Sequence, residues 1–177
     1  MRIIFFLFIS TCCFAQKTFV ENSKLSFFSV APLEDISAVS NKLQGVVDFE
    51  TGNFFFRVPI NTFVFPSSLM QKHFNEKYME SEKYSLSSFK GSFDNTIIID
   101  ENQQTKINAQ GILNIHGVNQ TVSIETELII QNKTVEFKSK FDVYLKDFKI
   151  KVPKIVRMNI ADTIQVNVSG VLKERNQ

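Results

Sequence analysis

The chain has 177 residues, a formal net charge of +2, and 21% charged residues. This length suits one domain with a sizeable core, and the near-balanced charge argues against electrostatic capture of nucleic acid or of an anionic membrane surface. With 19 Phe but only two His and two Cys, the composition supplies much apolar material and few catalytic side chains.

The first 15 residues have the pattern of a secretory signal peptide. Arg2 precedes a short apolar run at 3–9, and small residues lead to a cleavage point after Ala15. The run is well short of the roughly 20 residues needed to span a bilayer. We therefore expect an exported, soluble protein with no stable membrane span.

Both cysteines lie in this segment. A lipid-modified Cys12 is the alternative to cleavage, but Ser10-Thr11 before it is a poor fit to a lipobox, which disfavours lipoprotein anchoring. Cleavage after residue 15 leaves 16–177 as a single domain with no disulfide and no thiol nucleophile.

The first half of that domain is expected to contain strands at 24–30, 43–49 and 54–60, with a turn at 51–53. Phe54-Phe55-Phe56 places aromatic rings on both faces of its strand. One of those faces must therefore be covered by another element.

A helix over 68–81 is the expected cover. Ser68 and Gln71 fit a capping box after Pro66, and Met70, Phe74 and Tyr78 recur at helical spacing to form an apolar stripe. A shorter helical turn is expected at 33–36, and residues 87–100 are expected to return to β structure.

The second half alternates apolar and polar residues with period two. The clearest instances are 107–115, 122–130, 135–145 and 164–169, joined by short polar turns. This pattern predicts an antiparallel meander with one dry face. About eight such strands remove their free edges by closing, so we predict an all-β, eight-stranded antiparallel barrel with one helical insertion.

A barrel of this size is either filled by its own side chains or holds one small ligand. The dry faces carry small residues among large ones, which are Ala109 with Gly111, Thr126, Ser139 and Gly170. They are consistent with an apolar cavity or with relief of crowding in a solid core. Both interpretations stay open on the pattern alone.

Candidate chemistry is sparse. His73, Glu76 and Glu80 share a helix with Lys72 and Lys77, which fits surface ion pairing better than a metal or acid/base site.

His116 lies at a hairpin tip, on the solvent-facing phase of its strand, and is interpreted as a turn residue. The sequence contains no Gly-rich phosphate loop, Cys/His cluster or dinucleotide fingerprint. We therefore predict no enzyme activity, no metal and no cofactor. The basic stretch at 146–153 is interpreted as a polar strand end, with guidance of an anionic headgroup as the alternative.

Four segments carry a family resemblance. In chain order they are 70–84 followed by Phe89, 111–118 followed by Val122, 145–150, and 166–171. Together they resemble the YceI-like family over roughly 68–172. The family's glycine-containing pattern in the early strands is matched only in part, at 44–49.

The resemblance implies a lipocalin-like barrel in the periplasm with a polyisoprenoid, fatty-acid-like or similar long-chain ligand in its pore. It favours the open interior. The expected lining is Ile107, Leu113, Val122, Ile124, Leu128, Phe137, Phe141, Val143, Val166 and Val168.

The expected partner is thus a long-chain apolar small molecule. Two other functions remain as rivals. One is a ligand-free structural or interaction barrel of the cell envelope, for which self-association into a homodimer is also open. The other is a hydrolase or metal enzyme using His73, Glu76 or His116.

Overall fold

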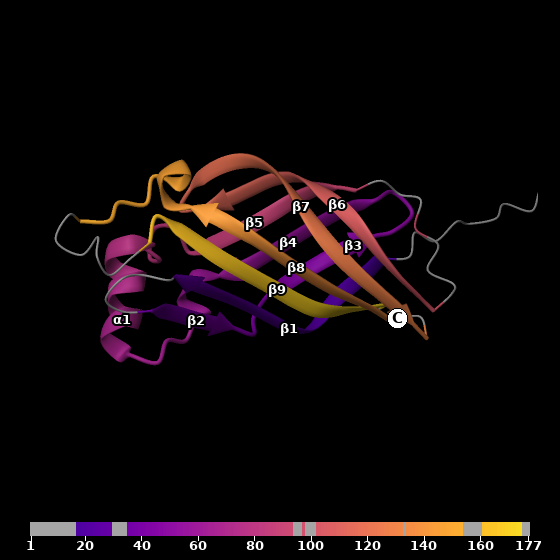
Figure 1. The fold of residues 1–177 in the computed structure, drawn as a ribbon, viewed down its shortest axis with the longest axis horizontal. Coiled ribbons are helices and arrows are strands. Elements are labelled where there is room, and N and C mark those ends of the chain that lie inside the picture. Colours follow the sequence, from indigo (N-terminus) through magenta and orange to yellow (C-terminus); the bar gives the residue numbers. More distant parts are fainter. Residues whose placement is uncertain are drawn as a thin grey trace, which may run out of the picture.

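The computed structural model describes residues 17–29, 35–93, 97, 102–132, 134–153 and 161–174, so the expected signal peptide lies outside the described residues. Within these ranges the chain forms one nine-stranded sheet and a short helix (Figure 1). The strands are β1 (Lys17–Ser29), β2 (Ile36–Ser40), β3 (Gln44–Asp48), β4 (Asn53–Pro59), β5 (Leu86–Ser92), β6 (Gln103–Ile115), β7 (Val118–Gln131), β8 (Thr134–Tyr144) and β9 (Thr163–Glu174). The helical elements are η1 (Ile60–Thr62), α1 (Ser68–His73), η2 (Phe74–Tyr78) and η3 (Leu145–Phe148).

The sheet closes on itself through β1. One edge of β1 pairs with β9, while the other edge pairs with β3 at its start and with β2 from Leu25 to Ser29. All neighbours are antiparallel, so β1 and β3 to β9 form the predicted eight-stranded barrel. Because β3 pairs with only three residues of β1, the far half of that edge is left for β2 to cover.

Two expectations for the early chain need correction. Residues 33 and 34 of the expected helical turn lie outside the described residues, and its last residue, Ile36, begins β2 instead. Strand β1 begins at Lys17 rather than at residue 24. Its register shifts between Glu21 and Lys24, which interrupts the alternation by which a strand is recognised.

The helix begins one residue earlier than the capping-box pattern indicates. Ser67, not Ser68, is the N-cap, and its Oγ accepts a hydrogen bond from the backbone N–H of Met70 at 3.4 Å. Gln71 Oε1 accepts from the backbone N–H of Phe65 at 3.2 Å. The α-helix passes into a π-helical turn at Phe74 and ends at Tyr78, short of the expected residue 81.

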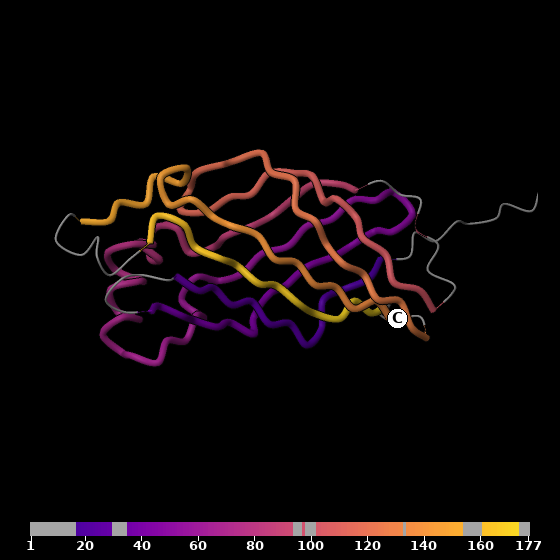
Figure 2. Tube along the Cα trace, in the orientation of Figure 1, coloured from indigo at the N-terminus to yellow at the C-terminus, as the bar shows by residue number. Residues whose placement is uncertain are grey.

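The helix lies at one end of the barrel, opposite the β7–β8 turn (Figure 2). Its apolar stripe of Met70, Phe74 and Tyr78 packs against the core, as predicted. The expected cover over one face of the strand at 54–56 is wrong, since Phe55 on the outer face is 38% exposed. The Phe74 ring lies 5.5 Å from that of Phe27 and 4.9 Å from that of Phe65, measured between centroids. Aromatic contacts of this kind fix the helix over the barrel end.

The opposite end is closed by aromatic rings. Phe49, after β3, lies 5.8 Å from Phe93, after β5, and Phe93 stacks on Phe54 at 6.5 Å. All three side chains are buried. Among the described helices, none has the length and apolar character required to cross a membrane.

Candidate ligand-binding cavity

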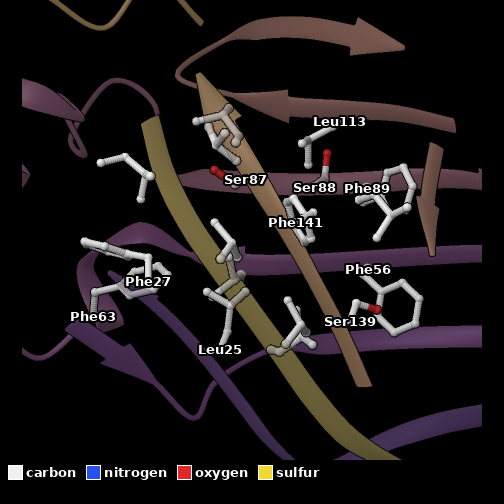
Figure 3. A pocket seen from close by; sticks show the side chains of 18 of the residues that line it. Leu25, Phe27, Phe56, Phe63, Ser87, Ser88, Phe89, Leu113, Ser139 and Phe141 are labelled. Atoms are coloured by element: carbon white, nitrogen blue, oxygen red, sulfur yellow. The ribbon is translucent and has the colours of Figure 1, made fainter. Parts of the chain in front are cut away.

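A cavity of about 600 Å³ occupies the barrel interior. Every strand of the sheet contributes to its wall, and α1 and η2 add residues at one end. Figure 3 shows part of this lining, with Leu25 and Phe27 of β1, Phe56 of β4 and Phe141 of β8 among the labelled side chains. The wall is mostly Val, Ile, Leu and Phe. The volume falls within the range of about 300–1,000 Å³ for small-molecule sites. The interior is therefore open, and the solid-core alternative for the whole barrel is wrong.

Nine of the ten residues expected to line a pore border this cavity. They are Ile107, Leu113, Ile124, Leu128, Phe137, Phe141, Val143, Val166 and Val168. The tenth, Val122, is half-buried across from Gly111 and packs against the hydrophobic core instead of bordering the cavity. Contact of these side chains with a ligand stays a prediction.

The first half of the chain supplies the rest of the wall, which the expected lining did not include. The main contributors are Leu25, Phe27, Phe54, Phe56, Val58 and Phe63. The period-two spacing of Leu25, Phe27 and Ser29 was a usable signal for β1. The aromatic run at 54–56 gave no such signal for β4, because both faces of that strand carry apolar residues and the inner face cannot be identified.

The small residues divide between the two interpretations offered for them. Ala109, Thr126 and Ser139 border the cavity. Gly111 does not border it. A Cβ at Gly111 would lie 2.2 Å from the carbonyl oxygen of Lys90, so no larger residue fits there. At Gly170 a Cβ would meet the Phe137 ring at 2.8 Å. The two glycines therefore relieve crowding, while the other three residues leave space.

The cavity reaches the surface beside α1. Leu69 borders it and is 60% exposed, and the nearby Val64 is 65% exposed. Tyr78 also borders this end. Burial raises the pKa of Tyr78 above its ordinary value of 10.0, so its phenol is neutral at physiological pH and adds no charge to the cavity wall.

His116 occupies the predicted turn, with left-handed backbone at both His116 (φ 53°) and Gly117 (φ 71°). Its side chain is not solvent-facing as expected, since only 11% of it is exposed. Nε2 lies 2.9 Å from Glu80 Oε2, and Nδ1 lies 3.4 Å from the carbonyl oxygen of Phe148. The ring also meets Tyr84 edge-on at 4.5 Å. His116 thus ties the β6–β7 hairpin to the segment after η2 and to η3.

Replacing His116 should loosen these three segments together. Asn tolerates left-handed backbone. We expect His116→Asn to lower the free energy of unfolding by about 1–3 kcal/mol, because the hydrogen bonds of a ring that is only 11% exposed are lost. Urea unfolding measures the loss, and hydrogen exchange should rise at 79–84 and 145–150. The control is His73→Asn, at a helix position where the ring Nε2 lies 3.2 Å from Lys77 Nζ. Unchanged exchange in both segments would contradict the proposed tie.

Within the described residues, the histidines and carboxylates do not assemble into a metal site. Glu76 and Lys77 are exposed on the helix, and His73 is half-buried at the cavity rim. Over the ranges that the structure describes, no group of three or more His, Cys, Asp or Glu side chains comes close enough to hold a metal ion. Glu80 pairs with His116 rather than with the other helix residues.

Comparison with known proteins agrees with this architecture. The YceI-like domain family model matches residues 18–172. A polyisoprenoid binding domain from Saccharophagus degradans superposes with a TM-score of 0.79 at 12% identity, covering 91% of this chain and 99% of that chain. BcnA from Burkholderia cenocepacia gives 0.73 at 17% identity, covering 86% and 98%. Comparison with the curated proteins finds no match. At these identities the structural likeness concerns the fold.

Proposed function

This chain belongs to the YceI-like family, and from that premise we propose that it is an exported protein that carries or sequesters a long-chain apolar ligand inside its barrel. The ligand class we propose is a polyisoprenoid or a fatty-acid-like chain. In this proposal the protein binds its ligand and does not catalyse a reaction on it. Its support is the apolar cavity of about 600 Å³, together with the polyisoprenoid binding domain among similar structures.

The energetics suit a long hydrocarbon chain. Burying one methylene contributes about 0.8 kcal/mol, so a ten-carbon chain gains about 8 kcal/mol before the costs of ordering and of lost translation are subtracted. A short ligand would not offset those costs. Length, rather than a strong polar contact, is therefore the expected source of affinity.

The entrance we propose is the α1 end. Leu69 is exposed there and borders the cavity, whereas Phe49, Phe54 and Phe93 close the opposite end. A charged headgroup would remain in water at the α1 end, since burying it unpaired is strongly unfavourable. Periplasmic location is part of the proposal and rests on the signal-like pattern of residues 1–15.

Purified protein should carry lipid. We expect organic extraction followed by mass spectrometry to identify a long-chain compound, and delipidated protein to take up a fluorescent fatty-acid analogue that the extracted lipid displaces. Protein with neither bound lipid nor probe uptake would contradict the carrier function. The rival interaction barrel predicts that outcome together with a stable oligomer by light scattering.

A further inference from the structure

Several hydroxyl groups lie among the apolar residues of the cavity wall, and two of them face each other across neighbouring strands. Thr126 on β7 and Ser139 on β8 are cross-strand partners, and both border the cavity. Their oxygens, Oγ1 and Oγ, lie 2.8 Å apart. The inward residues on either side along β8 are Phe137 and Phe141. Along β8, the two hydroxyl groups are thus flanked on both sides by apolar side chains.

The hydrogen bond within the pair uses only one of its two protons. Each hydroxyl carries one donor, so when one hydroxyl donates to the other, the second keeps an O–H that is donated to no protein group within the described residues. The Ser40–Thr62 pair differs. Thr62 Oγ1 donates to the carbonyl oxygen of Pro59 at 2.6 Å, so Ser40 donates to Thr62 and both protons are used.

Other buried hydroxyls away from the cavity also find protein acceptors. Thr18 donates to the carbonyl oxygen of Val47 and Ser23 to that of Leu43, each at 3.2 Å. Thr126 is as enclosed as these residues, at 9% exposed, yet its pair faces the cavity. A buried donor without an acceptor is unfavourable, so an acceptor supplied by a ligand would be stabilised there.

We infer that the Thr126–Ser139 pair is a subsite for a neutral acceptor oxygen, such as a carbonyl, ether or hydroxyl, borne within the ligand's hydrocarbon chain. The inference rests on the proposed function. An anionic group does not fit, because within the described residues the pair has no cationic hydrogen-bond partner, and an unpaired buried charge is costly. Arg57, which also borders the cavity, is exposed and donates from Nε to Gln44 Oε1 at 2.9 Å. Ser139 is the central residue of β8 and borders the cavity (Figure 3), so the oxygen belongs to the body of the ligand and not to a headgroup at the entrance.

The test compares ligands that differ only in this oxygen. A saturated fatty acid and a series of its keto analogues, with the carbonyl moved along the chain, would each displace a fluorescent fatty-acid analogue from the protein. We expect the wild type to favour one keto position over its neighbours. The ratio of dissociation constants, plain acid over best keto acid, should be about 2- to 12-fold larger than in a protein lacking both hydroxyls.

Removing both hydroxyls requires Thr126→Val with Ser139→Ala. Either substitution alone leaves one hydroxyl with a free proton, so the single variants should keep the preference and the double variant should lose it. Thr121→Val with Ser123→Ala, at exposed positions of β7, is the matched control for stability and binding.

Two failures are distinguishable. An unchanged preference in a folded double variant, or no preferred keto position in the wild type, would overturn the subsite while leaving the carrier function intact. No displacement of the probe by any of the acids would count against the carrier function itself.

Discussion

Val168→Trp should reduce ligand affinity by 100-fold or more while leaving the barrel folded. Val168 lies on β9 and pairs with Leu25 of β1 on one side and Ser139 of β8 on the other. Its side chain borders the cavity and is half-buried. An indole ring there would take the space of about four methylenes, and the loss of their burial is about 3 kcal/mol, which corresponds to at least a hundredfold change in affinity.

The measurement is a titration with the fluorescent fatty-acid analogue, alongside urea unfolding. Overpacking costs about 1–3 kcal/mol, so a modest loss of stability is expected. Lys140→Trp, exposed on the outer face of β8 next to Val168, adds the same ring outside the cavity and should bind as the wild type does. A folded Val168→Trp protein with wild-type affinity would mean that the ligand does not occupy the barrel.

Gly111→Ala should severely destabilise the barrel. Gly111 on β6 pairs with Gly91 on β5, and their backbones approach so closely that a Cβ on Gly111 would lie 2.2 Å from the Lys90 carbonyl oxygen and 2.7 Å from the Gly91 Cα. Backbone atoms cannot rotate away as a side chain can. The strands must separate, which also disturbs the ladder on either side.

We expect a loss of about 4 kcal/mol or more, seen as a fall in melting temperature of roughly 10 °C. Gln110→Ala, exposed on the next residue of the same strand, removes a side chain from the outer face and should change stability by less than about 0.5 kcal/mol. A Gly111→Ala protein as stable as the wild type would show that the two strands have room to adjust.

The second half of the barrel was predictable because its alternation is uninterrupted. Along β7, inward and outward residues exchange regularly from Val118 to Gln131, and this parity identified the inner face and most of the second-half lining. In β1 the register shift after Glu21 breaks the parity. The five residues of β2 are too few to carry a clear pattern.

The cavity itself could not be derived from parity. Period two shows which side chains point inward, but not how far apart opposite walls lie. Ser139 and Gly170 were equivalent in the sequence, yet Ser139 borders open space and Gly170 lies under the Phe137 ring. The buried position of His116 was also hidden, because its partners Glu80 and Phe148 are both more than 30 residues away.

The pairing of β1 with β9 sets the order in which the barrel can fold. Thr18 is opposite Glu174, so the ring cannot close until β9 has been synthesised. Contacts between such distant segments slow folding. Until β9 arrives, β1 and β8 each present an open edge able to recruit strands from other molecules. A nascent chain of this topology therefore needs protection from aggregation until β9 is in place.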